Sequence, residues 1–344
     1  MRKQTIKGLA VGLVAVVGLA ACGSSSSSDT TVAAGSAGLA CEVTDTGGVD
    51  DKGFNQIAHE GLLQAETQLG VKTDLLESTT DADYAPNLQS FVDKGCNVIV
   101  TVGFLLADAT KAAAEANPTV QFAIVDSNTS APNVQGLTFA TDQPSFLAGY
   151  MAAATTKSGI VGTFGGINIP PVAIFMQGFA KGVEYYNAQK KTSVKVLGWD
   201  IAKQDGTFTG DFSDQTKGTS TAKSMADEGA DIIFPVAGPV GLGASQYAMD
   251  SAGKVKIIGV DVDMSISNPT QAEVYVASVL KKIDSAVLQA VKDALAKTGG
   301  GTDYLGTLAN GGVGVAITST ITPELQAELD AVKAGIIDGS IVTK

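Results

Sequence analysis

The chain has 344 residues, 44% of them hydrophobic, which is longer than one hydrophobic core normally serves, so two lobes are expected. Its 35 acidic residues outnumber the 23 lysines and arginines and give a formal net charge of -12. Such a surface repels phosphate backbones, so we expect no nucleic-acid partner.

The first 21 residues predict a signal peptide. Three basic residues precede an uncharged run, 8–21, that is shorter than the roughly 20 residues needed to span a bilayer. The run ends in LAAC, residues 19–22, which resembles the lipobox of bacterial lipoproteins and implies lipid attachment at Cys22. A plain signal peptide is the alternative.

Residues 22–38 consist mostly of serine and other small residues. They carry too few apolar side chains to pack, which predicts a flexible tether. Together with the lipid, this indicates a protein anchored to the cell membrane on its extracytoplasmic face.

Two further cysteines, Cys41 and Cys96, each precede an apolar run. The compartment permits disulfides, and the first and third strands of a doubly wound sheet are neighbours. We therefore expect a Cys41–Cys96 disulfide, with two buried free thiols as the alternative.

Strands and helices alternate along the folded part. The first series has strands at 41–46, 71–77, 97–102, 121–125 and 134–138, and helices at 54–69, 84–94 and 105–116. The second has helices at 142–156, 171–187, 214–227 and 241–252, and strands at 159–163, 194–199, 231–234 and 256–260. A strand at 275–279, a helix at 281–297, two short strands within 304–317 and a helix at 323–337 complete the chain. This alternation predicts an α/β fold with parallel sheets covered on both faces.

The doubled alternation predicts two doubly wound lobes joined by a three-stranded hinge. We assign residues 39–141 and 266–302 to the N-terminal lobe, and residues 142–265 and 303–344 to the C-terminal lobe. The chain is expected to cross between the lobes near 139–142, 263–269 and 300–304. A ligand would then close the lobes as rigid bodies.

The stretch 44–56, TDTGGVDDKGFNQ, predicts a binding corner. Its two adjacent glycines allow a sharp turn after the strand, and Asp50 or Asp51 can cap the helix that follows. Phe54 and Asn55 would then face the crevice at the carboxyl end of the sheet, where ligands of such folds bind.

Polar residues and glycines recur where the predicted strands end. They include Asp45, Gly103, Asp126, Gly165, Gly166, Asp200, Gly238, Asp261 and Asp263. Because parallel strands end at one edge of a sheet, these residues define a rim on each lobe. Two rims facing each other predict a cleft for a small molecule.

Catalytic motifs are scarce. The only histidine, His59, lies inside the first predicted helix, and the sequence contains neither a Gly-x-Ser-x-Gly motif nor a Gly-Lys-Ser/Thr phosphate loop. The segment from Asp261 begins like a calcium loop, but Ile266 stands where that loop needs glycine. We expect no catalytic residue, metal or cofactor, and hence no enzyme. Hydrolysis by paired carboxylates stays open as an alternative.

Six segments together closely resemble the basic membrane protein family. They are 44–56, 122–126 (FAIVD), 146–153 (FLAGYMAA), 161–166 (VGTFGG), 259–263 (GVDVD) and 278–281 (SVLK). The resemblance implies a type I periplasmic-binding-protein fold and a lipoprotein that binds substrate for an ABC importer. It also implies an ABC permease and its ATPase as partners. Several members of the family bind purine nucleosides, and we expect a monomer.

The resemblance also implies roles for single residues. Phe54 and Phe212 would sandwich a purine, with Phe208 as the rival of Phe212, and Asn55 and Asp126 would bind the base edge. Gly238, Asp261 and Lys281 would hold the ribose hydroxyls, and Asp45 completes the ligand-binding set. Lys281 is expected at the start of a helix, where a cation is unfavourable unless a ligand or carboxylate holds it. Two positions depart from the family pattern, Gly53 for serine and Met264 for glutamine.

We therefore predict a membrane-tethered, extracytoplasmic protein that binds a purine nucleoside between two lobes for an ABC importer. The alternative within the same fold is a receptor for a sugar or another small metabolite. A surface nucleoside hydrolase is the alternative from another class.

Overall fold

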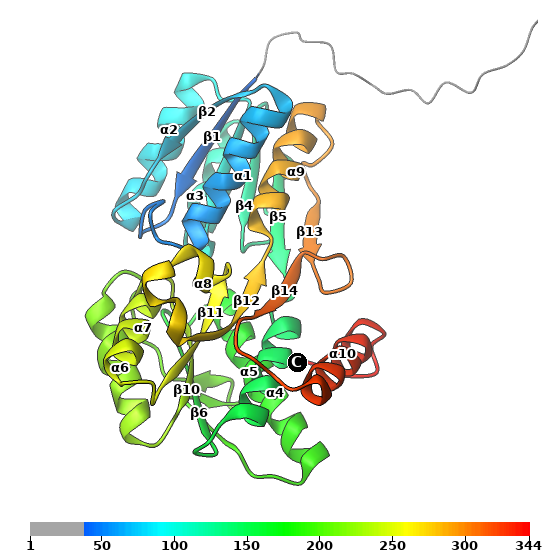
Figure 1. Cartoon of the computed structure of the whole chain (residues 1–344). Coiled ribbons are helices and arrows are strands. Elements are labelled where there is room, and N and C mark those ends of the chain that lie inside the picture. Colours follow the sequence, from blue (N-terminus) through cyan, green and yellow to red (C-terminus); the bar gives the residue numbers. More distant parts are fainter. Residues whose placement is uncertain (1–37) are drawn as a thin grey trace, which may run out of the picture. The chain divides into compact units, whose positions relative to one another are not determined.

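The computed structural model describes residues 38–344. The expected signal peptide, Cys22 and all of the tether before residue 38 lie outside the described residues. Residues 38–344 form two six-stranded sheets, each covered by helices on both faces (Figure 1).

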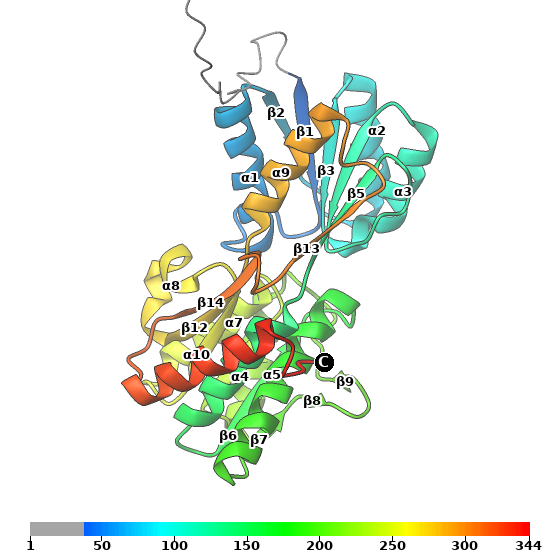
Figure 2. The same ribbon diagram turned by 90° about the vertical axis from the view of Figure 1, so that its right-hand side faces the viewer.

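The first sheet is parallel throughout and has the strand order β13-β5-β4-β3-β1-β2. Its strands are β1 (Leu39–Thr44), β2 (Lys72–Leu76), β3 (Val98–Val102), β4 (Gln121–Val125), β5 (Val134–Phe139) and β13 (Asp303–Gly306). Helices α1 (Phe54–Leu69) and α9 (Ile283–Ala296) lie side by side on one face (Figure 2). Helices α2 (Tyr84–Lys94) and α3 (Ala107–Ala116) pack against the other face. We call this sheet and its helices the first lobe.

The second sheet has the order β14-β12-β11-β10-β6-β7, and only its edge strand β14 (Val313–Ile317) runs antiparallel. The others are β6 (Ile160–Gly165), β7 (Lys195–Leu197), β10 (Ile232–Val236), β11 (Lys256–Asp261) and β12 (Tyr275–Lys281). Helices α4 (Asp142–Thr155) and α5 (Pro170–Lys190) form one layer, with α10 (Pro323–Ile337) on α4. Helices α6 (Gln215–Asp227) and α7 (Val240–Asp250) form the other. We call this sheet and its helices the second lobe.

Two of the three expected hinge positions are wrong. The chain crosses once at 139–142, as expected, but it stays in the second sheet through β12 and returns to the first lobe only with α9. It then adds β13 to the first sheet and crosses again before β14. The residue pattern of a strand does not encode which sheet the strand joins. The expected bounds therefore put 275–281 in the first lobe and 303–306 in the second, whereas the structure has the opposite assignment. We propose lobe bounds of 39–139 with 283–306, and 142–281 with 313–344.

Cys41 and Cys96 form a disulfide, with their Cα atoms 6.1 Å apart. Cys41 lies in β1 and Cys96 precedes β3, and these two strands are paired. The expected neighbourhood of the first and third strands is thus confirmed. The disulfide ties the loop after α2 to the sheet.

The sequence missed three short elements of the second lobe. They are the hairpin β8 (Trp199–Asp200) and β9 (Asp205–Gly206), the helical turn α8 (Met264–Ser267) and the 3-10 segment Pro269–Val274. Each is shorter than the window of about 11–18 residues over which hydrophobic periodicity is read. Asp200 consequently lies in an exposed hairpin and not on a rim.

Candidate functional site

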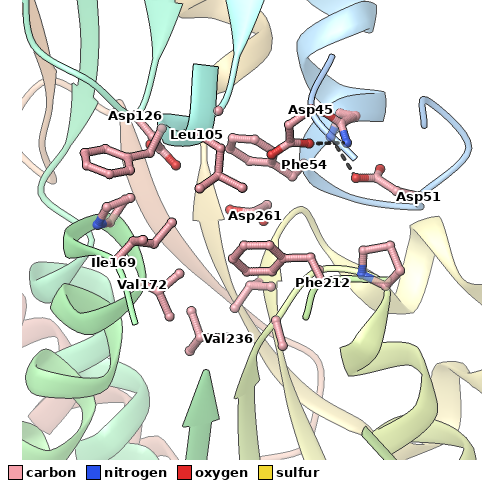
Figure 3. Close-up of a pocket in the computed structure, with 18 of the residues that line it drawn as sticks. Asp45, Asp51, Phe54, Leu105, Asp126, Ile169, Val172, Phe212, Val236 and Asp261 are labelled. Carbon is pink, nitrogen blue, oxygen red and sulfur yellow. Dashed lines mark hydrogen bonds between the residues drawn. The ribbon is translucent and has the colours of Figure 1, made fainter. Parts of the chain in front are cut away.

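A cavity lies between the carboxyl ends of the two sheets (Figure 3). All eight residues expected to bind ligand line it: Asp45, Phe54, Asn55, Asp126, Phe212, Gly238, Asp261 and Lys281. The first lobe supplies Asp45, Phe54, Asn55 and Asp126, and the second lobe supplies the rest. The structure thus brings together residues more than 230 positions apart in the chain.

Four charged residues of the cavity stand where strands end. Asp45 follows β1, Asp126 follows β4, and Asp261 and Lys281 are the last residues of β11 and β12. Asp126 and Asp261 have φ angles of 66° and 68°, in the left-handed region that side-chain-bearing residues seldom adopt. Strain of this kind persists only where the surroundings impose it, and it is frequent at ligand sites.

Lys281 is the last residue of a strand, and the expectation of a helix start is wrong. Strand β12 continues to Lys281 because it is paired on both sides. Its Leu280 lies opposite Asp261 of β11, and its Lys281 lies opposite Val313 of β14. Helix α9 begins at Ile283, after the crossing to the first lobe. The side chain of Lys281 therefore points from the sheet edge into the cavity and is 2% exposed.

Lys281 joins the two lobes by an ion pair. Its Nζ donates to both carboxylate oxygens of Asp126, at 2.8 and 2.7 Å, and lies 3.8 Å from an oxygen of Asp261. The same Nζ lies 4.7 Å from the centre of the Phe54 ring. Burial raises the pKa of Asp261 to about 6, although Lys281 opposes the rise.

The turn before α1 is held by Asp51. Its carboxylate accepts hydrogen bonds from the backbone amides of Gly53 (2.8 Å), Asn55 (2.8 Å) and Gln56 (3.1 Å). Of the two capping candidates, Asp51 is therefore confirmed, whereas Asp50 is exposed. Three accepted amides fix the first turn of α1, which carries Phe54 and Asn55.

Asp45 lies in a tight pocket of its own. Its Oδ1 accepts from the Asn55 side-chain amide at 3.0 Å. Its other oxygen packs against Gly103, where a Cβ atom would lie 2.5 Å away, so glycine is required there. Burial raises the pKa of Asp45 to about 8, and nearby Asp51 and Asp126 add to the rise.

The cavity contains more hydrogen-bond acceptors than donors. Asp45, Asp51, Asp126 and Asp261 all line it, whereas Lys281 is the one lysine or arginine among the described residues that do so. An ionised carboxylate only accepts hydrogen bonds, and a protonated one, as the raised pKa of Asp45 favours, still keeps an accepting oxygen. The arrangement thus suits an uncharged molecule with several hydroxyl or N–H groups, and it opposes a phosphate or carboxylate.

Aromatic and aliphatic side chains form the rest of the lining. Phe54 projects from the first lobe and Phe212 from the loop before α6 in the second lobe (Figure 3). Phe208, the rival of Phe212, packs instead on Trp199 with ring centres 6.4 Å apart and does not line the cavity. A flat apolar ligand could therefore contact rings from both lobes.

Several lining residues were not found by sequence reasoning. They are Thr46, Phe104, Leu105, Ile169, Pro171, Val172, Phe175, Val236, Ala237, Pro239 and Val260, together with Asp51 and Gly103, which the sequence had assigned only to a cap and a rim. Most are apolar residues at the ends of buried strands or the starts of helices, where their pattern resembles that of core residues. The one signal in the sequence was their position just after a predicted strand end, as for Phe104 and Leu105 after Gly103.

The comparisons with known proteins agree with this geometry. The profile of the family described as "ABC transporter substrate-binding protein PnrA-like" matches residues 39–344. The chain belongs to this family. Membership implies a small-molecule ligand and transporter partners.

Individual relatives are similar over most of their lengths. The "ABC transporter nucleoside-binding protein BmpA" of Lactococcus lactis subsp. cremoris is 33% identical over 359 aligned positions, covering 99% of each chain. "Basic membrane protein A1" of Borrelia garinii subsp. bavariensis is 32% identical, covering 86% of this chain and 85% of its own. These names describe binding and membrane proteins, and neither describes an enzyme.

Among solved structures, a solute-binding protein of an ABC transporter system from Aeropyrum pernix K1 has a TM-score of 0.77 at 26% identity. The match covers 89% of this chain and 93% of that one. A second solute-binding protein, from Conexibacter woesei, has a TM-score of 0.67 at 22% identity, which shows the fold alone. The expected type I periplasmic-binding fold is confirmed.

Within residues 38–344, no helix combines the length and apolar character needed to cross a membrane. The same residues contain no group of three or more histidine, cysteine, aspartate or glutamate side chains arranged to hold a metal ion.

Proposed function

We propose that this protein captures a purine nucleoside in the cavity between its lobes and delivers it to an ABC permease. The observation that carries the proposal is the pair Phe54 and Phe212, which reach the cavity from different lobes next to Asp126, Asp261 and Lys281. Rings from two sides suit a flat base, and the charged groups suit vicinal hydroxyls. One relative is named as a nucleoside-binding protein, and this chain matches it over nearly its whole length. That name supports the same ligand class.

The residues divide between base and sugar. Phe54 and Phe212 stack on the base, and Asn55 and Asp126 bind its polar edge. Gly238, Asp261 and Lys281 hold the ribose hydroxyls. Asp45 acts mainly through Asn55. It accepts a hydrogen bond from the Asn55 side-chain amide and so fixes the orientation of that side chain.

The protein binds its ligand and does not alter it. Among residues 38–344, none that lines the cavity is a histidine, cysteine or serine that could serve as nucleophile or base. A hydrolase would have to rely on the carboxylates alone, as paired carboxylates do in glycosidases. Incubation with inosine followed by chromatography distinguishes the two, since release of hypoxanthine in proportion to protein would establish hydrolysis.

The protein acts outside the cytoplasm as a lipid-anchored monomer. Cys22 carries the lipid, and residues 22–38 give the folded part room to meet its permease. Mass spectrometry of membrane-extracted protein tests this anchor, because acylation adds a defined mass to the peptide that begins at Cys22.

Calorimetric titration with a ligand panel tests the ligand class. Adenosine, guanosine and inosine are expected to bind, uridine to bind more weakly because its ring is smaller, and ribose alone to bind very weakly. Stacking contributes about 1–3 kcal/mol per base in other proteins, so ribose should lose at least about tenfold in affinity. Equal binding of ribose and inosine would instead favour the sugar receptor.

A further inference from the structure

Glu42 is a carboxylate that the ligand site does not use. It lies in the middle of β1 with 0% of its surface exposed, and neither of its oxygens has a hydrogen-bond partner among the described residues. In the sheet its neighbours are Leu75 of β2 and Val100 of β3, which carry no charge. A buried carboxylate without a partner is costly, so a nearby group must compensate it.

His59 is that group. Its Nδ1 lies 3.7 Å from Glu42, beyond hydrogen-bond length, so the attraction is electrostatic. Contact with Glu42 raises the pKa of His59, although partial burial opposes the rise, and the charges of Glu77 and Glu60 act in the same direction as Glu42. Of the charged residues of α9, the helix beside α1, Asp284 accepts a hydrogen bond from the Gln64 side-chain amide at 3.4 Å. Burial in turn raises the pKa of Glu42.

The pair is connected to the cavity by short stretches of two elements. Glu42 and Thr44 point to the same face of β1, and Asp45 of the cavity follows directly. His59 follows Asn55 by one helical turn on α1. The Thr44 hydroxyl and the Asn55 side-chain oxygen are also buried without a partner among the described residues. A row of polar groups thus runs from Asp45 beneath α1 to His59, which is 23% exposed.

We propose that Glu42 and His59 position the first turn of α1, and with it Phe54 and Asn55, and that the pair makes ligand affinity depend on pH. This inference rests on the proposed function of the cavity. While the pair holds one proton, Glu42 is either neutral or faces a charged imidazole, and α1 is held against β1. When the pair loses that proton, Glu42 is left as an isolated buried charge, and the first turn of α1 loosens.

The sign follows from the two raised values. Because both pKa values are raised, the pair keeps a proton in the folded protein at a pH where the unfolded chain has released it. Stability from the pair is therefore present at low pH and is lost as pH rises through the raised pKa of His59. Ligand affinity is expected to fall over the same range.

The first test needs no ligand. His59 is the only histidine of the chain, so the imidazole signal in the proton NMR spectrum of tag-free protein belongs to it. We expect a midpoint above 6.5 in the natural protein and a lower midpoint in Glu42→Gln, where burial is opposed only by the charges of Glu77 and Glu60. The backbone amide signals of Phe54 and Asn55 should titrate with the same midpoint. An ordinary midpoint, or amides that do not follow His59, overturns the proposal.

The second test measures affinity for adenosine and guanosine by calorimetry from about pH 5.5 to about pH 8.5. Asp45 and Asp261 titrate in this range in every variant, so the comparison between variants isolates the pair. Between these limits the natural protein should lose roughly three- to thirtyfold more affinity than Glu42→Gln. His59→Gln should bind more weakly than the natural protein near neutral pH, and the two should converge towards about pH 8.5, where His59 of the natural protein has lost its proton.

Glu66→Gln is the matched control, because Glu66 is exposed on the same helix and is not among the charges that raise the pKa of His59. It should follow the natural protein. Parallel profiles for the natural protein and Glu42→Gln overturn the inference even if adenosine binds. If neither nucleoside binds to any variant, the proposed function fails, while the amide titration still decides the positioning role.

Discussion

The two rims of the cavity are built differently. In the first lobe, the Asp51 carboxylate accepts hydrogen bonds from backbone amides of residues shortly after it. Asp45 accepts a hydrogen bond from the side chain of Asn55 on the next helix. In the second lobe, Phe212, Asp261 and Lys281 come from three separate segments. The charge of Lys281 is balanced mainly by Asp126, which belongs to the opposite lobe. The first rim is thus organised within itself, whereas the second depends on contact with the first.

This difference bears on how the lobes close. We expect the lobes to rotate as rigid bodies about the three crossings, so some contact must stabilise the closed arrangement. The Lys281–Asp126 pair does so across the cleft, since both charges are at least 89% buried. Opening would expose each charge to water, so a ligand that binds both groups adds to a contact that already favours closure.

The largest expected effect comes from breaking that contact. Lys281→Met keeps a long side chain but leaves Asp126 and Asp261 without their cation. Removing one partner of a buried pair typically costs about 3–5 kcal/mol, so thermal unfolding should occur at a clearly lower temperature. Calorimetry should at the same time show nucleoside binding strongly weakened.

Lys282→Met is the matched control, because Lys282 is exposed and adjacent. It should unfold and bind nearly as the natural protein does. Similar unfolding temperatures for the two variants would contradict a stabilising role of the interlobe ion pair.

The contrast between the rims also explains what could be predicted from sequence. The first rim is encoded within 44–56, where glycines, a capping aspartate and helical spacing act locally, and α1 has the predicted bounds. Strand and helix positions in both lobes were likewise local properties. The pairing of β12 was not a local property, because strand pairing depends on tertiary contacts. The expected hinge positions and the expected helix start at Lys281 were therefore wrong.

The second rim required more than local patterns. Phe212 and Phe208 both lie in the same irregular loop, and only the fold decides that Phe212 faces the cavity while Phe208 packs on Trp199. The apolar lining of Ile169 and Val172 was missed because residues at a helix start resemble core residues. Resemblance to a family supplied Phe212 and Lys281, which spacing alone did not.

An intermediate effect should separate the rims by ligand. Phe54→Ala removes the ring of the first rim and should weaken nucleoside and free base alike, by about 1–3 kcal/mol. Asp261→Ala removes a carboxylate of the second rim and should weaken nucleoside binding by about 1.5–3 kcal/mol, with less effect on the free base. Calorimetry with inosine and hypoxanthine measures both.

Asp263→Ala controls for the loss of charge near the strand end, because Asp263 caps α8 and does not line the cavity. It should leave the ratio of inosine to hypoxanthine affinity unchanged. If Phe54→Ala and Asp261→Ala shifted that ratio equally, the division between base and sugar would be wrong.

The smallest effect concerns the internal order of the first rim. Asp51→Ala leaves three backbone amides at the start of α1 without their acceptor and should cost about 0.5–2 kcal/mol in the free energy of unfolding. Asp50→Ala, at the exposed neighbouring position, should change it by less than about 0.5 kcal/mol. Urea unfolding of both variants measures the difference.

The pH dependence sharpens this last comparison. Burial raises the pKa of Asp51 even though three amides favour its charged form. The folded protein therefore keeps a proton on Asp51 at a pH where the unfolded chain has lost it, so stability falls as pH rises through that raised pKa. Asp51→Ala has no such group. The free energy of unfolding that it loses relative to the natural protein should therefore be larger near about pH 4.5 than near about pH 7.5. A cost that grew with pH would mean that the amides outweigh burial, and that the first rim is organised by the carboxylate charge itself.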